Sequence, residues 1–216
     1  MNGERPAPRG LPTQGGLRTR RLFFALVPGG AARASLQALA RQHAPRRARL
    51  VGAADLHLTL VFLGAVGEEL LPRLRAAAAQ LRGAPCTVRL ERLERWRGGL
   101  LCATGPVPAP LQALHARLVG LARELGLAVD ARPLRAHVTL ARGLPRTALA
   151  AGATTPAGSA GPAGATLPPL RWRSRAFCLM ESRRRPDGGR YTIVGRWRLD
   201  SAPDAAKQHE EGPIRT

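Results

Sequence analysis

Two short stretches of the chain repeat one arrangement of polar side chains, His-x-Thr-Leu. His57 and Thr59 lie in "DLHLTLVFLG", and His137 and Thr139 lie in "RAHVTLARG". Side chains two positions apart point to the same face of a strand. Each His-Thr pair is therefore expected to face a cleft while its apolar neighbours face a core. The repetition predicts two strands that present these pairs to one shared groove.

This pair of motifs is suited to chemistry at phosphorus. An imidazole has an unperturbed pKa of about 6.5, so it can act as a base or as an acid near neutral pH. Two imidazoles can divide those roles, and nearby hydroxyls can donate hydrogen bonds to the non-bridging phosphate oxygens. The layout requires no metal ion and no cofactor. An isolated His-Thr pair is more often a hydrogen-bonded structural pair, and only the repetition favours the catalytic interpretation.

The net charge points to an anionic partner. The chain of 216 residues has a formal net charge of +20, almost wholly from arginine, since Lys207 is the only lysine. Such an excess attracts nucleic acid through steering and counterion release. The alternative is a charge dispersed over a solvated surface, as biased codon usage would produce. Charge alone therefore does not decide the chemistry.

Cysteine spacing and hydropathy indicate the compartment. Cys86, Cys102 and Cys178 form no C-x-x-C pattern, so neither a disulfide framework nor a zinc site is indicated. No segment approaches the roughly 18–20 apolar residues that span a bilayer. We expect a cytoplasmic, monomeric protein with no membrane partner.

The periodicity of apolar residues predicts alternating strands and helices. Strands are expected at 21–28, 56–63, 86–93, in "LLCATG", and at 134–142, 175–181 and 191–199, with helices at 31–42, 68–81 and 110–125. Low-complexity composition predicts a disordered leader (1–20), a flexible insertion (145–169) and a disordered tail (201–216). A single two-lobed domain is thus expected over residues 21–200.

With these motifs in place, the chain resembles a known family. "RLFFALVP", "LHLTLVFLG", "AHVTLAR" and "ESRRRPDGGRYTIVGRWRL" look like the two-histidine (2H) phosphoesterases, specifically the LigT-like RNA 2′,3′-cyclic phosphodiesterases, formerly called 2′-5′ RNA ligases. The resemblance runs from about Arg21 to Leu199. It implies an α+β fold in which two antiparallel sheets flank a central cleft with helices outside. It also implies hydrolysis of RNA ends or oligonucleotides with a 2′,3′-cyclic phosphate to 2′-phosphomonoesters.

The same resemblance implies roles for individual residues. His57, Thr59, His137 and Thr139 would be the catalytic set, with His137 as the base that activates water and His57 as the acid. A near-symmetric site could run the other way in reverse. Arg142, five residues after His137, would bind phosphate, a role that suits its bidentate guanidinium. The family often has proline before the second histidine, where this chain has alanine.

Two other functions use the same residues. Reverse joining of a cyclic phosphate end to a 5′-hydroxyl would form a 2′-5′ linkage with the same histidines. A non-catalytic RNA-binding module would keep the cleft without turnover. The aromatic residues that could stack on bases are Trp96, Trp172, Trp197 and Tyr191, although such residues are more often part of a core. His43, His115 and His209 have no threonine partner and are expected to be bystanders.

Overall fold

The computed structural model describes residues 18–130, 132–145, 165–183 and 189–200. Its strands are β1 (Thr19–Leu26), β2 (Arg49–Leu50), β3 (Leu58–Gly67), β4 (Cys86–Trp96), β5 (Leu100–Gly105), β6 (Ala136–Arg142), β7 (Ala165–Ser174), β8 (Ala176–Ser182) and β9 (Tyr191–Arg198). Its helices are α1 (Gly30–His43), α2 (Leu71–Gln80) and α3 (Ala109–Glu124), with short 3₁₀ turns η1 (Ala53–Asp55) and η2 (Glu68–Leu70).

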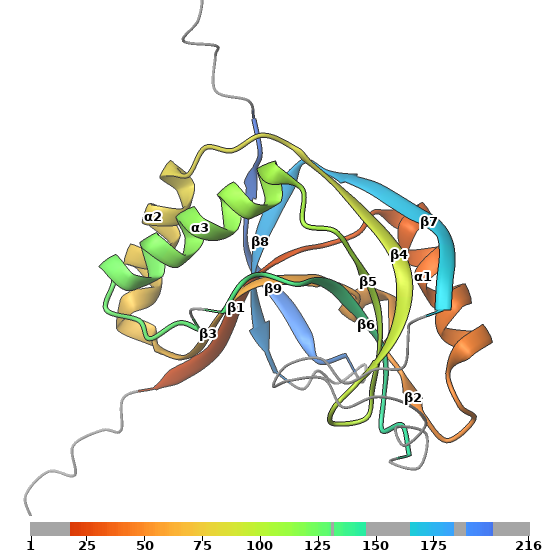
Figure 1. Cartoon of the computed structure of the whole chain (residues 1–216). Coiled ribbons are helices and arrows are strands. Elements are labelled where there is room, and N and C mark those ends of the chain that lie inside the picture. The colour runs from red at the N-terminus through yellow and green to blue at the C-terminus, as the bar shows by residue number, and fades with distance from the viewer. Residues whose placement is uncertain (1–17, 131, 146–164, 184–188, 201–216) are drawn as a thin grey trace, which may run out of the picture.

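The strands form two antiparallel sheets (Figure 1). Within the described ranges, sheet A has the order β3-β1-β8-β9 and sheet B has the order β2-β6-β5-β4-β7. Each sheet takes strands from both ends of the chain, so the chain crosses between the sheets several times. The two sheets therefore belong to one folding unit, and the fold is α+β, as expected.

The helices lie outside the sheets. Figure 1 shows α2 and α3 side by side on one flank of the molecule and α1 on the other. Helix α3 packs on β3 of sheet A, and α1 packs on β6 and β7 of sheet B. Each of these helices thus covers the sheet that does not contain the strand before it, because α1 follows β1 and α3 follows β5. The helices therefore do not cover the place where β3 of sheet A meets β6 of sheet B.

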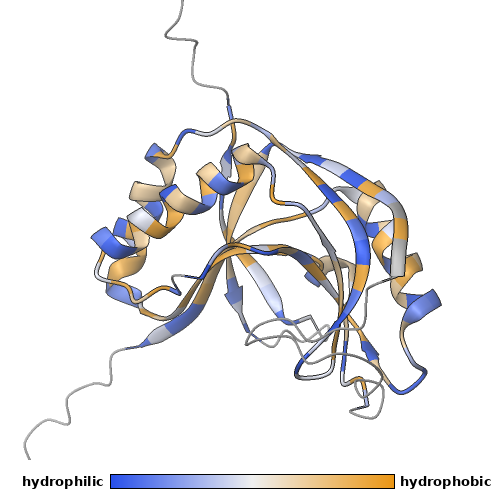
Figure 2. Ribbon diagram, in the orientation of Figure 1, coloured by the Kyte–Doolittle hydropathy of each residue, from blue (hydrophilic) through white to orange (hydrophobic). Residues whose placement is uncertain are grey.

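Strand β1 is buried on both faces. Leu22, Phe24 and Leu26 belong to the main core, which is continuous through both sheets and the three helices. Phe23 and Ala25 point the other way, into a small second cluster with Cys178 and Met180. Figure 2 shows the matching pattern, with hydrophobic residues along the strands and hydrophilic residues on the outer turns of the helices. The second cluster supplies an apolar floor on the face opposite the main core.

Strand β3 departs from the simple alternation expected of residues 56–63. The strand begins at Leu58, so His57 is the residue just before it. Its pairing with β1 shifts register twice. Such a bulge reverses which side chains face inward, and Val61 and Leu63 are consequently buried while Phe62 is 43% exposed. Phe62 therefore faces outward, whereas strict alternation with Leu58 and Leu60 would bury it.

The other expected elements are present with small shifts at their ends. Gly98 and Gly99 form the expected turn between β4 and β5, both with positive φ, and Gly126 ends α3 in the same conformation. The structure adds β2, and it adds β7, which takes in residues 165–169 of the expected flexible insertion. Pairing with β4 orders this stretch despite its simple composition, because backbone hydrogen bonds do not depend on side-chain variety.

The expected disordered segments fall mostly on residues that the structure does not describe. Of the leader (1–20), only residues 18–20 are described, and β1 already begins at Thr19. Residues 146–164 of the insertion and the whole tail (201–216) lie outside the described residues.

Candidate functional site

The two histidines lie where the sheets approach each other. His57 precedes β3 of sheet A, and His137 lies in β6 of sheet B, paired with Thr104 of β5. Strands β3 and β6 are in contact. Burial lowers the pKa of His57, and the nearby charges of Arg142 and of a protonated His137 lower it further. The structure therefore brings the two motifs, 80 positions apart in the sequence, to one place.

Both imidazoles are held by the same kind of hydrogen bond, to the backbone oxygen two residues before the histidine. The Nδ1–H of His57 donates to the backbone oxygen of Asp55 at 2.7 Å, and that of His137 donates to the backbone oxygen of Arg135 at 2.8 Å. A carbonyl oxygen only accepts, so each Nδ1 carries a proton. Neither Nε2 makes a hydrogen bond to a described residue. In the neutral state, each ring thus has its Nε2 lone pair available as a base, and in the protonated state each can donate from the same atom.

Burial favours the neutral form of both rings. It lowers the pKa of His57 and of His137, because a charged imidazolium loses hydration in the site. Repulsion from Arg142 lowers both pKa values further, while the backbone oxygens that accept from Nδ1 raise them. An anion placed between the rings and Arg142 would reverse the repulsive part of this balance.

Aromatic rings fix the orientation of each imidazole. The His57 ring packs 4.9 Å from Phe23 and 4.8 Å from Tyr191, between centroids. The His137 ring lies 4.4 Å from that of Trp96, and the Arg135 guanidinium covers the Trp96 ring at 4.6 Å. These contacts restrict rotation about the side-chain bonds. Trp96 and Tyr191 thus lie at the site, whereas Trp172 is buried in the core and Trp197 packs against it.

Glu94 ties the Trp96 side of the site together. Its carboxylate accepts hydrogen bonds from Trp96 Nε1 at 2.7 Å, Thr104 Oγ1 at 2.8 Å and Arg135 at 3.1 Å. Thr104 is the strand partner of His137. The carboxylate thus binds three residues that contact or pair with His137. Its negative charge raises the pKa of His137 and so offsets part of the lowering by burial.

The two threonines are half-buried on the strands that carry the histidines. Thr139 Oγ1 lies 3.8 Å from the Sγ of Cys102. Burial raises the pKa of Cys102 to about 11, so this thiol stays protonated near neutral pH and is no candidate nucleophile. Val138 and Leu140 are fully buried, so β6 shows the alternation that its sequence predicts.

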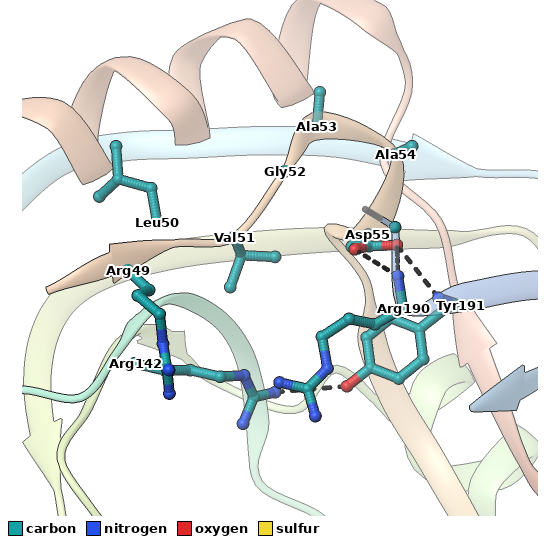
Figure 3. A pocket seen from close by; sticks show the side chains of 11 residues that line it. Arg49, Leu50, Val51, Gly52, Ala53, Ala54, Asp55, Arg142, Arg190 and Tyr191 are labelled. Carbon is teal, nitrogen blue, oxygen red and sulfur yellow. Dashed lines mark hydrogen bonds between the residues drawn. The ribbon is translucent and has the colours of Figure 1, made fainter. Parts of the chain in front are cut away.

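Arg142 reaches toward the same site from the end of β6. Its guanidinium donates to the Tyr191 hydroxyl at 3.4 Å. Both side chains line a cavity of about 490 Å³ (Figure 3). The structure thus connects the predicted phosphate-binding arginine with an aromatic residue that also packs on His57.

Asp55 is a site residue that the sequence analysis missed. Its carboxylate is buried and accepts hydrogen bonds from the backbone N–H groups of Arg190 and Tyr191, at distances of 2.9–3.2 Å. Its backbone oxygen holds His57. Asp55 therefore joins the His57 segment to the start of β9. A signal was present in the sequence, since an aspartate two positions before the histidine breaks an apolar run.

The remaining histidines lie away from this chemistry. His115 in α3 bonds to the backbone oxygen of Leu60 and so attaches the helix to β3. His43 ends α1, and His209 lies outside the described residues.

In the described parts of the chain, no group of three or more His, Cys, Asp or Glu side chains is placed to hold a metal ion. No helix in those parts is both long enough and apolar enough to cross a membrane.

Comparisons with known proteins agree with the geometry. The model of the 2′-5′ RNA ligase superfamily matches residues 27–186. The RNA 2′,3′-cyclic phosphodiesterase of Escherichia coli (strain K12) is 32% identical over 126 residues, which is 57% of this chain and 72% of that protein.

Solved structures show the same architecture. E. coli LigT complexed with 3′-AMP has a TM-score of 0.67 and 28% identity, covering 84% of this chain and 99% of that one. TT0787 of Thermus thermophilus has a TM-score of 0.61 and 26% identity, covering 83% of this chain and 97% of that one. The family match spans most of the chain and the fold agrees with it, so the protein belongs to the 2′-5′ RNA ligase superfamily and is a phosphoesterase of the two-histidine type.

Proposed function

We propose that the protein hydrolyses RNA 2′,3′-cyclic phosphate ends to 2′-phosphomonoesters without a metal ion. The observation that carries this proposal is the pair of imidazoles, one just before β3 and one in β6, each with Nδ1 bound to a backbone oxygen and Nε2 available. Two imidazoles in this state supply both proton transfers that the reaction needs. The relationship to the E. coli phosphodiesterase supports the same substrate class.

The reaction assigns one step to each group. His137 Nε2 takes a proton from water as the water oxygen attacks phosphorus. The bond between phosphorus and the 3′ oxygen breaks, and protonated His57 donates its Nε2 proton to that leaving oxygen. The product is a 2′-phosphate with a free 3′-hydroxyl, and the two histidines exchange protonation states.

The remaining groups stabilise the charge that develops on phosphate. Thr59 and Thr139 donate hydrogen bonds to the non-bridging oxygens, and Arg142 offers its guanidinium to the same anion. The bound phosphate also raises the pKa of His57, because it offsets the repulsion from Arg142. Substrate binding thereby helps to protonate the acid.

The test is hydrolysis of an oligoribonucleotide with a 2′,3′-cyclic phosphate end in the presence of EDTA. The wild type should yield a 2′-phosphate, and His57→Ala and His137→Ala should each lower kcat by roughly 10²–10⁴-fold. His43→Ala, at the end of α1, is the matched control and should keep full activity. Full turnover in either site variant, or a 3′-phosphate product, would overturn the proposal.

Joining of RNA ends is the second candidate, because the family is described by that reaction. In ligation an RNA 5′-hydroxyl replaces water: it loses its proton to His137 and attacks phosphorus, and the 3′ oxygen leaves with a proton from His57. Adding an excess of 5′-hydroxyl RNA to the assay measures the partition. A 2′-5′-linked product that exceeds hydrolysis would favour ligation.

A further inference from the structure

The cavity beside the site is lined by three arginines from three different segments. Arg49 comes from β2, Arg142 from β6, and Arg190 from the residue before β9. Arg49 and Arg142 are direct partners in the antiparallel pairing of β2 with β6. Figure 3 shows the Arg142 and Arg190 guanidinium groups reaching into the same space beside the Tyr191 hydroxyl. Three positively charged side chains therefore line the same cavity.

Among the residues with a described placement, no carboxylate side chain is paired with the outer two of these arginines, Arg49 and Arg190. Asp55 is the carboxylate in the cavity lining, and its oxygens accept from backbone N–H groups of Arg190 and Tyr191. Arginines elsewhere do find such partners, as in the pairs Arg20–Glu181, Arg132–Asp130 and Arg135–Glu94. Uncompensated guanidinium groups in a hollow favour an anion with several oxygens.

Arg142 lies close to the two histidines, whereas Arg49 and Arg190 lie farther from them, at the edges of the two sheets. The charge of Arg142 lowers the pKa of both imidazoles, so this arginine acts on the phosphate that reacts. Arg49 lies one strand farther out, on the edge strand of sheet B, and Arg190 precedes the edge strand of sheet A. Both side chains are exposed at the rim of the cavity. They are therefore placed for an anion next to the reactive one.

We propose that Arg49 and Arg190 bind the next phosphate of the RNA strand, the one on the 5′ side of the nucleotide that carries the cyclic phosphate. This inference rests on the proposed function. A cyclic phosphate at the 3′ end of a strand has no neighbour beyond it, so the adjacent phosphate is necessarily the 5′ one. The subsite selects RNA ends, and nucleotides with a 5′-phosphate, over cyclic nucleotides that lack one.

Binding of stable product analogues tests the subsite directly. Adenosine 2′-monophosphate and adenosine 2′,5′-bisphosphate differ only in the 5′-phosphate, and titration calorimetry gives the affinity for each. We expect the wild type to bind the bisphosphate at least tenfold more tightly, about 1.4 kcal/mol. In the Arg49→Ala/Arg190→Ala double variant, the ratio of the two affinities should fall to near one. Arg73→Ala, which removes an exposed arginine of α2, should leave the ratio unchanged.

Two results would overturn the inference. One is a wild-type protein that binds both nucleotides equally. The other is a double variant that loses affinity for both by the same factor, since the arginines would then serve the reactive phosphate.

Kinetic measurements distinguish failure of the second phosphate site from failure of the proposed hydrolysis. Adenosine 2′,3′-cyclic phosphate with and without a 5′-phosphate is compared by kcat/KM. A preference for the 5′-phosphorylated substrate, lost in the double variant, supports both proposals. Hydrolysis without preference refutes the subsite alone. A bisphosphate preference in binding without any hydrolysis refutes the proposed reaction and leaves the subsite standing.

Discussion

At the scale of single residues, the two imidazoles themselves are held by backbone oxygens rather than by carboxylates. Each histidine uses the carbonyl oxygen two positions before it, from Asp55 or from Arg135. A neutral carbonyl oxygen fixes the tautomer with the proton on Nδ1, but it raises the pKa of the imidazole less than a carboxylate would. Burial can then keep both pKa values low.

The low pKa values predict a particular pH dependence. In the proposed mechanism the productive free enzyme has one protonated and one neutral imidazole, and burial lowers the pKa of both below about 6.5. We expect kcat/KM to peak below pH ~6.5 and to fall roughly tenfold per pH unit on the alkaline side, as the acid loses its proton. The alkaline limb of kcat should lie at higher pH, because bound phosphate raises the pKa of His57.

The measurement is a pair of profiles, kcat/KM and kcat, over a pH range of about 4.5–8.5. A kcat/KM that rises through neutral pH would contradict the expected ionisation. Coincident alkaline limbs would show that the substrate anion does not assist the acid.

At the scale of secondary structure, apolar periodicity predicted most elements but not their pairing defects. The alternation in β6 follows the sequence, and Val138 and Leu140 are buried as expected. In β3, the register shifts against β1 reverse the pattern and expose Phe62. A bulge depends on the partner strand, so the sequence of β3 alone cannot reveal it. Strand β2, with two residues, is too short to show any period.

The same limit applies to the site residues. The His-x-Thr repeat pointed to His57 and His137, because each histidine and its threonine are close neighbours in the sequence, within β6 or at the start of β3. Asp55 and Tyr191 were harder to place, since they meet only through a contact between segments 136 positions apart. Such a contact follows from the arrangement of η1 and β9, which no local pattern encodes.

The link between η1 and β9 makes a prediction for Asp55→Ala. Removing the carboxylate leaves the partly buried N–H groups of Arg190 and Tyr191 without this acceptor. We expect the free energy of unfolding to fall by about 1–3 kcal/mol, and kcat to fall because Tyr191 and His57 pack on each other. Urea denaturation measures the first effect and the oligonucleotide assay the second.

Asp130→Ala is the matched control, because that exposed carboxylate pairs only with the neighbouring Arg132 among the described residues. Its urea midpoint should match the wild type. An Asp55→Ala protein as stable as this control would contradict the structural role of the buried carboxylate.

At the scale of the whole molecule, the crossing of the chain makes one site from both halves. Helix α1 lies on sheet B and α3 on sheet A, so neither sheet can complete its core without the other half. The site between β3 and β6 therefore depends on the complete fold. The whole chain has 34 basic residues against 14 acidic ones, and this net positive charge attracts an RNA strand that extends away from its reactive end.

The salt dependence of RNA binding tests whether the basic residues contact phosphates along the whole strand. For single-stranded RNA, the logarithm of affinity falls with the logarithm of salt concentration with a slope of about −0.7 per phosphate contacted. We expect the slope for oligonucleotides with a 2′-phosphate end to steepen with each added nucleotide beyond the second phosphate, because more arginines then meet the backbone. Fluorescence anisotropy between about 50 and 200 mM salt measures it. A slope that stops changing after two phosphates would mean that Arg49, Arg142 and Arg190 account for the electrostatic binding, and that the remaining positive charge is dispersed over the surface without following the RNA.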